Sequence, residues 1–213
     1  HVVCRRQRQM CIRDSWDTRP WAENSSTIMR KNQPIIGAND GASGVAVILE
    51  LAKIMKKNPP PIGVSLVLFD AEDYGTSADS WSYAKGSQFF AQNIPISYPM
   101  YAINLDMIAD REPEFYIERY SYQQNPTLVL ELWELAESLN LDTFKKQAKY
   151  TIFDDHVPLY QMAGIPAIDI IDFDFPNEKT NYHHTHQDIV QNCSPKGLGE
   201  VGTLMLNHIY NIK

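Results

Sequence analysis

The sequence has little of several features that mark whole classes of protein. No apolar run approaches the roughly 18 residues that a membrane-spanning helix needs. Charged residues make up only 21% of the chain and hydrophobic residues 44%, a balance unlike that of disordered proteins. Basic residues are also few, 19 against 26 acidic ones, so the net charge of -7 argues against a nucleic-acid partner and a polybasic membrane anchor. The 213 residues are enough for one globular domain.

Cysteine is scarce and unevenly placed. Two of the three cysteines, Cys4 and Cys11, lie in the first fifteen residues, which leaves Cys193 alone in the body of the chain. That body cannot form an internal disulfide, so the cysteine content does not indicate a cellular compartment.

The first fifteen residues differ from the rest in composition. Four of them are arginine and one is Asp14, which gives a charge of +3 here and -10 over the remaining residues. The stretch has neither a helical period nor strand alternation. We expect residues 1–15 to be a tail that does not pack against the domain, either a non-native segment of translated adapter sequence or a disordered basic arm. The folded domain then comprises residues 16–213.

From Trp16 onward, apolar segments of strand length alternate with segments of helical period. Strands are predicted over 64–70, 101–107 and 165–172, and helices over 40–57, 125–140, 158–162 and 194–212. This alternation predicts an α/β fold, a three-layer α/β/α sandwich with a mostly parallel central sheet. Ligands of such sheets lie beyond the carboxyl ends of the strands.

Acidic residues gather at the ends of the predicted strands. Glu72 and Asp73 follow the first strand, Asp106 ends the second, and a histidine-rich loop follows the third. Each feature alone has a plain structural explanation, since Asp40 could cap a helix and the paired acids could be a solvated strand end. Together they supply the mixed carboxylate and imidazole ligands of catalytic zinc sites, with a further carboxylate free to act as a base.

Five ordered motifs resemble one enzyme superfamily, that of the zinc aminopeptidases and glutaminyl cyclases. They are GANDGASGVAVILELAKIM (37–55), VLFDAEDYG (67–75), INLDMI (103–108), FDDHVPLYQMAGIPAIDII (153–171) and HTHQD (184–188). The resemblance covers nearly all of residues 16–213. It implies a zinc exopeptidase-like catalytic domain of the phosphorylase/hydrolase-like fold, with the N-terminus of a peptide or protein as substrate.

The resemblance also implies roles for individual residues. The ligands of one Zn²⁺ would be Asp40, Asp73 and His184, and the catalytic carboxylates Glu72, Asp106 and Asp154, with Asp155 competing for the place of Asp154. Glu72 would act as the general base.

One departure from the superfamily pattern concerns a second metal. The upstream motif of the superfamily is His-Trp-Asp-Thr-Arg-Pro, and here Ser15 stands at the histidine position in SWDTRP (15–20). That histidine holds the second metal in the dinuclear peptidases, so the resemblance predicts about one zinc in this chain. It also implies that N-terminal strands of the catalytic domain are missing, and that the protein is exported by a bacterium to the periplasm or beyond.

The branch of the superfamily is predicted from local sequence. In the peptidases a Gly-Ser follows the acidic pair closely, whereas here twelve residues (74–85) separate Asp73 from Gly86. This insert, the paired aspartates of DDH and the AEDYG segment resemble the bacterial cyclases. The predicted activity is therefore that of a glutaminyl-peptide cyclotransferase. A zinc aminopeptidase and a catalytically inactive peptide-binding module are the alternatives.

Substrate contacts are predicted to be largely aromatic. Trp81, Phe173 and Phe175 could wall a pocket of glutamine size, although packing in the core explains each of them equally well. His183 stands where many cyclases have a tryptophan beside the zinc-binding histidine. We expect Trp81, Phe175 and His183 to contact the substrate.

Overall fold

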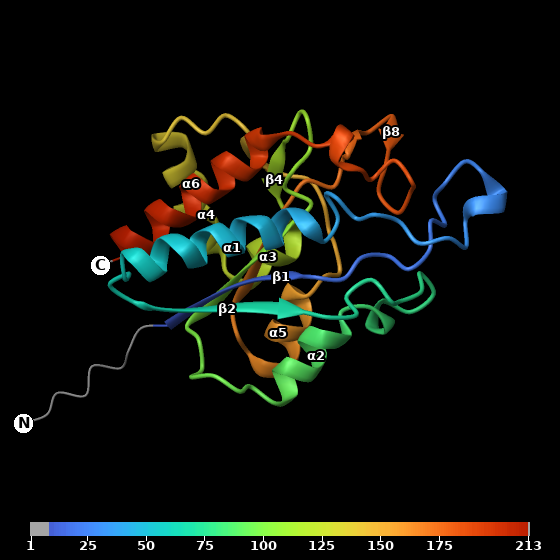
Figure 1. Cartoon of the computed structure of the whole chain (residues 1–213). Helices are drawn as coiled ribbons and strands as arrows, with labels where there is room; N and C mark the ends of the chain where they lie inside the picture. The colour runs from blue at the N-terminus through green and yellow to red at the C-terminus, as the bar shows by residue number, and fades with distance from the viewer. Residues whose placement is uncertain (1–8, 213) are drawn as a thin grey trace, which may run out of the picture.

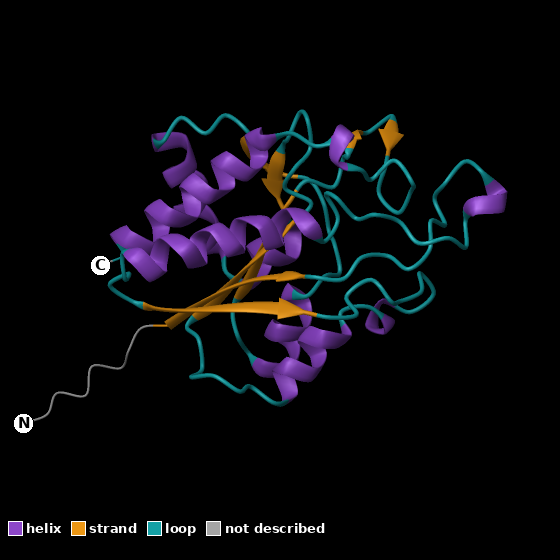
Figure 2. Cartoon of the chain, in the orientation of Figure 1, coloured by secondary structure: helices purple, strands orange, loops and turns teal. Residues whose placement is uncertain are grey.

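The computed structural model describes residues 9–212, whose central feature is a four-stranded parallel sheet with helices on both faces (Figure 1, Figure 2). The strand order is β2-β1-β3-β6. These strands are β1 (Gln9–Ser15), β2 (Gly63–Phe69), β3 (Tyr101–Asp106) and β6 (Ala167–Ile171). Every pairing within the sheet is parallel, as the predicted fold class requires.

The helices form the two outer layers. One face of the sheet is covered by α1 (Ala42–Lys57), α4 (Pro126–Ser138) and α6 (Pro195–Asn211), and the other by α2 (Lys85–Gln92) and α5 (His156–Ala163). Helix α3 (Arg119–Gln124) packs beside β6. The remaining elements are β4 (Phe115–Ile117), β5 (Phe144–Ala148), β7 (Pro176–Asn177), β8 (Thr180–Asn181), and the 3-10 turns η1 (Ile28–Arg30), η2 (Ser80–Ser82) and η3 (Val190–Asn192).

Side chains alternate across the sheet and build one core on each face. Met10 and Ile12 belong to the core beneath α1, α4 and α6, whereas Cys11, between them, belongs to the core with α2 and α5. This alternation follows from the two-residue period of a strand. The three-layer α/β/α arrangement predicted from the sequence is therefore confirmed.

The elements predicted from apolar periodicity are present with small shifts at their ends. The three predicted strands correspond to β2, β3 and β6, and the four predicted helices to α1, α4, α5 and α6. The predicted stop signals also act as expected. Asn125 caps α4 by accepting the N–H of Leu128 at 3.2 Å, Ser194 caps α6, and Gly164 ends α5 in the left-handed conformation with φ of 66°.

The expectation that residues 1–15 form a tail apart from the domain is wrong for residues 9–15, while residues 1–8 lie outside the described residues. Residues 9–15 form β1, which pairs with β2 on one side and β3 on the other. Pairing on both sides satisfies the backbone of β1, and Met10, Cys11 and Ile12 are fully buried in the two cores. The sequence did not predict this strand, because three apolar residues followed by the charged Arg13 and Asp14 do not form a recognisable strand pattern.

Burial of β1 places two charged side chains inside the protein. Arg13 and Asp14 are both fully buried, and neither forms an ion pair within residues 9–212. The Arg13 guanidinium lies 5.5 Å from the ring centroid of Phe69 and has no hydrogen-bond partner among the described residues. Burial, and then the charge of Asp154, raise the pKa of Asp14 well above its ordinary value. Both side chains therefore impose a desolvation cost on the fold.

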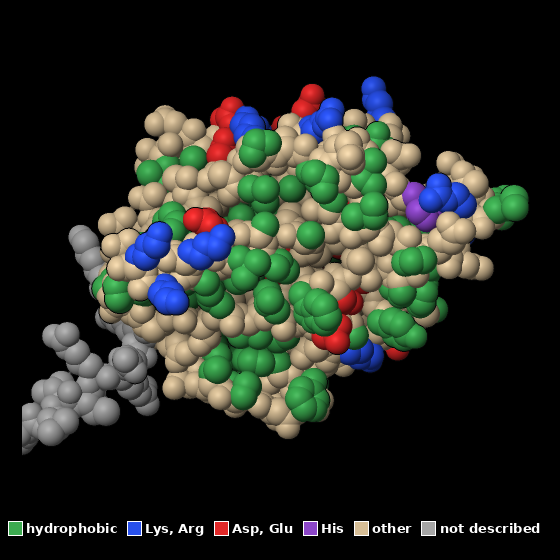
Figure 3. Space-filling model, in the orientation of Figure 1, with side chains coloured by type: hydrophobic (Ala, Val, Ile, Leu, Met, Phe, Trp, Pro, Cys, Tyr) green, Lys and Arg blue, Asp and Glu red, His purple; other side chains and the backbone are tan. Residues whose placement is uncertain are grey.

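The surface is mixed in character. The face in Figure 3 carries acidic and basic side chains in small separate groups among scattered hydrophobic ones, and no continuous basic patch covers that face. Among the described residues, no helix is both long enough and apolar enough to cross a bilayer. Strand β2 lies at an edge of the four-stranded sheet and is only partly buried over residues 63–67 and exposed at Leu68.

Replacing the buried carboxylate of β1 tests its energetic cost. We expect Asp14→Ala to raise stability by about 1–3 kcal/mol at pH 8, because it removes a charge that has no cationic partner. The raised pKa means that the native state binds more protons than the unfolded state between the two pKa values, so native stability falls as the pH rises through that interval. The gain should therefore be larger at pH 8 than at pH 4, as measured by denaturant unfolding.

Glu134→Ala is the matched control, because Glu134 is exposed on α4. Its effect should stay within about 0.5 kcal/mol at both pH values. A loss of stability in Asp14→Ala at pH 8 would show that the carboxylate is favourably solvated inside the fold.

Candidate functional site

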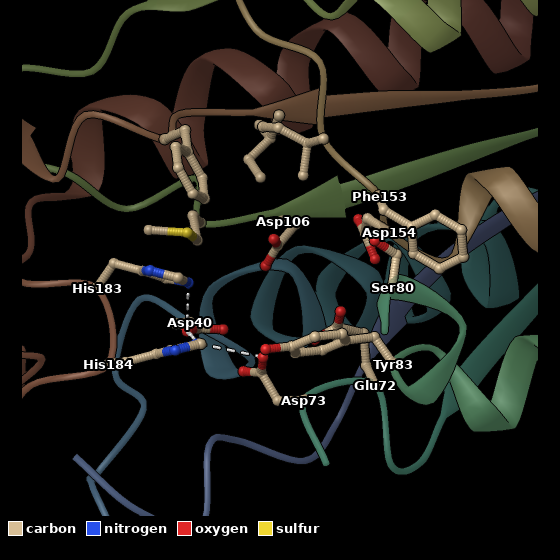
Figure 4. A pocket seen from close by; sticks show the side chains of 14 residues that line it. Asp40, Glu72, Asp73, Ser80, Tyr83, Asp106, Phe153, Asp154, His183 and His184 are labelled. Carbon is tan, nitrogen blue, oxygen red and sulfur yellow. Dashed lines mark hydrogen bonds and ion pairs between the residues drawn. The ribbon is translucent and has the colours of Figure 1, made fainter. Parts of the chain in front are cut away.

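A pocket lies at the carboxyl ends of the central strands, where the sequence predicted a ligand site (Figure 4). Its acidic and histidine side chains come from five separate segments and are Asp40, Glu72, Asp73, Asp106, Asp154, His183 and His184. All three predicted metal ligands and all three predicted catalytic carboxylates are therefore among them. The fold gathers them because parallel strands end at the same edge of the sheet.

His184 lies within a few ångströms of both predicted carboxylate ligands. His184 Nε2 lies 3.1 Å from Asp73 Oδ1 and 3.5 Å from Asp40 Oδ2. Ligand atoms bound to a tetrahedral zinc at about 2.0–2.1 Å lie about 3.3 Å apart. The distances from His184 to each carboxylate, and the chemistry of these donors, therefore fit Zn²⁺ held by Asp40, Asp73 and His184.

The charges of this group depend strongly on one another. Burial lowers the pKa of His184, but the hydrogen bond to Asp73 and the charges of Asp73 and Asp40 outweigh burial and raise that pKa to about 9. Burial raises the pKa of Asp73, and His184 more than reverses this, so the pKa is lowered. Burial and the charge of Asp73 raise the pKa of Asp40 well above its usual range. A bound cation would relieve the repulsion between the two carboxylates.

His183 is a neighbour of the metal ligands as well as a predicted substrate contact. Its Nε2 lies 3.8 Å from Asp40 Oδ2, and its ring stacks on His184 with centroids 3.6 Å apart. Nitrogen and oxygen atoms of Asp40, His183 and His184 all lie within 4.8 Å of one another. Burial, and then the charge of His184, lower the pKa of His183 to about 3. His183 is therefore neutral, and its position suits either an additional donor or a wall of the pocket.

A tight turn before α1 presents Asp40. Gly41 follows it with φ of 99°, and a Cβ there would lie 2.2 Å from the backbone oxygen of Asp17, so the position requires glycine. The buried carboxylate of Asp188 accepts the backbone N–H groups of Asn39 at 2.7 Å and Asp40 at 3.1 Å. Asp188 thereby ties the loop that carries His184 to the turn that carries Asp40.

The loop after β2 places Glu72 beside Asp73 in the pocket. The N–H of Glu72 donates to Asp17 Oδ1 at 3.2 Å, which fixes the backbone at this point. Burial, and then the charge of Asp73, raise the pKa of Glu72 well above its ordinary value. A carboxylate whose pKa is raised toward neutrality is suited to accept and return a proton.

Asp106 and Asp154 complete the carboxylates of the pocket. Burial, followed by the charges of Asp40 and Asp154, raises the pKa of Asp106 well above its usual range. The side-chain amide of Asn104 donates to Asp154 Oδ2 and, at 3.1 Å, to Asp169 Oδ1. Asp155 is fully buried and does not line the pocket. Of the two candidates in the DDH motif, Asp154 is the one that faces the pocket.

The aromatic side chains are placed differently from the prediction. Phe175 is fully buried and packs edge-on against Tyr182, so its predicted contact with substrate is wrong. Phe173, two residues earlier, lines the pocket and lies 5.0 Å from the ring of His183. Trp81 does not line the pocket itself. Its ring packs against the ring of Phe153, which lines the pocket, with the two centroids 5.1 Å apart.

A second polar cluster lies beneath the pocket. His156 Nε2 is 3.1 Å from Glu118 Oε2, and His156 Nδ1 is 4.0 Å from Asp169 Oδ2. Burial raises the pKa of Glu118, but His156 and backbone N–H groups outweigh this and lower it to about 2. The same carboxylate caps α3 through the N–H groups of Tyr120 and Ser121. The cluster is fully buried and joins α3, α5 and β6 under the loop that carries Asp154.

Three residues of the site were not singled out from the sequence. Asp188 belongs to the HTHQD motif, and its spacing from His184 was the available signal. Asn104 lies in INLDMI, where a polar residue inside a buried apolar strand was the signal. Glu23 had no signal, because its 3.0 Å contact with His184 Nδ1 joins segments that are 161 residues apart.

Comparison with known proteins places the chain among zinc exopeptidases. The model of peptidase family M28 matches residues 13–209. The structure is similar to that of Bacteroides thetaiotaomicron glutaminyl cyclase bound to N-acetylhistamine, with 33% identity and a TM-score of 0.92 over 97% of this chain and 74% of that one. It is equally similar to a leucine aminopeptidase precursor from Bacteroides thetaiotaomicron, with 33% identity and a TM-score of 0.91 over 97% of this chain and 73% of that one.

A curated relative belongs to the peptidase side. Aminopeptidase YwaD of Bacillus subtilis is 27% identical over 182 residues, which are 82% of this chain. The chain spans only 37% of the length of that relative. Overall similarity therefore indicates the fold and the metal chemistry, and does not separate cyclase from peptidase.

Zinc binding at this site should depend on pH. A zinc ligand must be a neutral imidazole, whereas the pKa of His184 in the metal-free protein is about 9. A proton therefore competes with zinc at every pH below about 9, and zinc affinity should rise by up to about tenfold per pH unit between pH 7 and 9. Chelator competition across this range measures the slope. A flat profile would show that His184 does not release a proton to the metal.

Proposed function

Because the chain belongs to peptidase family M28, we propose that it is a zinc-dependent glutaminyl-peptide cyclotransferase, which converts the N-terminal glutamine of a peptide to pyroglutamate and releases ammonia. The observation that carries this choice is the loop of residues 74–85. Ser80 and Tyr83 of this loop line the pocket, and Trp81 packs on Phe153 at its rim. The loop thus walls a small pocket beside the metal ligands, which suits a single short side chain.

Ser15 supports the same choice. It ends β1 with only 6% of its surface exposed and does not line the pocket. A serine hydroxyl cannot replace the imidazole that the dinuclear peptidases use for their second metal. The remaining donors fit one ion held by Asp40, Asp73 and His184, and this supports a reaction that needs one metal.

The protein's own carboxylates would move the protons of this reaction. Bound zinc would supply a Lewis acid that polarises the γ-carboxamide of the substrate glutamine. The substrate's α-amine forms the new bond to the carboxamide carbon, and the bond from that carbon to the amide nitrogen breaks. Glu72 accepts the proton that the attacking amine loses and returns it to the departing nitrogen, which leaves as ammonia. Asp106 and Asp154 would hydrogen-bond the amine and the carboxamide.

The alternative function is that of a zinc aminopeptidase. The equal likeness to a leucine aminopeptidase precursor and the match to an aminopeptidase favour it. In that reaction Glu72 would take a proton from water that attacks the first peptide bond, and would give it to the leaving amine. The same pocket would serve, because both enzymes receive a free α-ammonium group.

Metal content is the first test of the site. We expect the purified chain to hold about one zinc, because Asp40 and Asp73 both lie within 3.5 Å of the same imidazole, His184, and Ser15 stands at the position of the second-metal histidine. Elemental analysis after removal of loosely bound metal measures the ratio. Two tightly held zinc ions per chain would move the assignment to the dinuclear peptidases.

Two neighbouring substitutions separate the base from the ligand. Glu72→Gln should keep zinc and lose turnover by orders of magnitude, because an amide cannot accept the proton. Asp73→Ala should lose zinc, because it removes a direct ligand. Zinc content and turnover are measured on both proteins, with Glu178→Gln, a change at an exposed side chain, as the control. If Glu72→Gln loses zinc while Asp73→Ala keeps it, the two roles are reversed.

The products identify the reaction directly. A peptide that begins with glutamine should become lighter by one ammonia, and a leucyl anilide should stay intact, because the pocket is expected to hold a short carboxamide. Mass spectrometry with an ammonia assay follows both substrates. Release of the free amino acid would establish the aminopeptidase. A zinc-loaded protein that binds the peptide without converting it would establish a binding module.

A further inference from the structure

We propose that Glu23, oriented by Arg19, is a positioning residue that fixes the tautomer and orientation of His184 and thereby sets the metal affinity of the site. Both residues lie in the loop that follows β1; Arg19 belongs to the SWDTRP motif, and Glu23 lies outside every motif used above. The inference rests on the zinc site of the proposed function. It holds equally for a cyclase and a peptidase.

Glu23 contacts the side of His184 that faces away from the metal position. Glu23 Oε1 lies 3.0 Å from His184 Nδ1, while Nε2 of the same ring faces Asp73 and Asp40. A carboxylate accepts hydrogen bonds, so with a metal at Nε2 this contact holds the ring proton on Nδ1. The Nε2 lone pair is then available for the metal. An outer carboxylate of this kind also makes the imidazole a stronger ligand.

Arg19 holds Glu23 in the required position. Its Nε and Nη2 lie 2.8 Å and 2.7 Å from Glu23 Oε1, the same oxygen that faces His184. The guanidinium is 4% exposed and lies over the ring of Trp21, 4.7 Å from its centroid. A planar cation held by stacking, by one hydrogen bond and by a close ion pair restrains the position of Glu23 Oε1.

The same guanidinium also fixes the loop that carries Asp73. Its Nη1 donates to the backbone oxygen of Gly75 at 2.9 Å and to that of Asp73. Arg19 and Glu23 therefore connect two metal ligands, Asp73 and His184, that are 111 residues apart in sequence. Loss of Glu23 would release the imidazole, and loss of Arg19 would loosen both ligands.

The charge of Glu23 has a second consequence for the site. Its Oε2 is buried and has no hydrogen-bond partner among the described residues, so Arg19 and His184 are the groups that pair with this carboxylate. An anion behind a ligating imidazole increases the electron density on the metal-binding nitrogen. Orientation and charge can be separated experimentally, because a glutamine keeps an acceptor oxygen and lacks the charge.

The experiment compares Glu23→Gln, Glu23→Ala and Arg19→Lys with wild type. Zinc affinity is measured by competition with a chelator, and thermal unfolding is measured on the metal-free proteins. We expect Glu23→Ala to bind zinc about 10–100-fold more weakly and Glu23→Gln to fall between it and wild type. Arg19→Lys should also weaken binding, because an ammonium cannot reproduce the planar hydrogen bonds. The melting temperature of metal-free Glu23→Gln should fall less than that of Glu23→Ala, because glutamine keeps an acceptor for Arg19.

Glu137→Ala is the matched control, since Glu137 forms an exposed surface ion pair with Lys146. It should leave zinc affinity unchanged. The inference would be overturned if Glu23→Ala bound zinc as tightly as wild type. It would also be overturned if the weaker zinc binding of Glu23→Gln were fully explained by a lower stability of the metal-free protein. If Glu23→Ala does not fold, two measurements still decide: the zinc affinity of Glu23→Gln, and nitrogen NMR of the His184 ring in zinc-loaded wild type, where the inference requires the proton on Nδ1. Failure of wild type itself to bind zinc would reject the metal site and not the role of Glu23 alone.

Discussion

Repulsion between carboxylates is the constraint on which the rest of this site depends. Five acidic side chains share one pocket with two imidazoles, and the pKa values of Asp40, Glu72 and Asp106 are all raised well above their usual range. Such a group is stable only if protons or a cation offset the charge. Zinc would do so at Asp40 and Asp73, and would leave Glu72 as a carboxylate that exchanges its proton with substrate.

The ligands are held in place by contacts from outside the metal position. Asp188 supports the turn of Asp40 through two backbone N–H groups, and Asp17 supports the loop of Glu72 through one. Glu23 supports His184 from the ring nitrogen opposite the metal position. Each contact joins segments that are distant in sequence, so the geometry of the site is a property of the whole fold.

The sequence predicted the elements with long apolar runs and the residues within recognisable motifs. It did not predict β1, because Arg13 and Asp14 interrupt a run of only three apolar residues and their burial is unfavourable for isolated side chains. It named both Phe173 and Phe175 as possible walls of the pocket and chose Phe175 as the substrate contact, because a loop after a strand has no fixed side-chain period. The sequence could not decide between Asp154 and Asp155, because the backbone conformation of the turn before α5 determines which of the two side chains faces the pocket. The contact of Glu23 with His184 exists only in the folded chain.

The separation of the metal ligands along the chain gives the site a further effect on folding. The described residues contain no disulfide, since Cys11 and Cys193 are both free. An ion that joins Asp73 to His184 would close a loop of 111 residues and would remove conformational entropy from any partly unfolded state that keeps it bound. The zinc would thus act as a cross-link as well as a Lewis acid. Each tenfold rise in free zinc above the dissociation constant would then stabilise the native chain by about 1.4 kcal/mol.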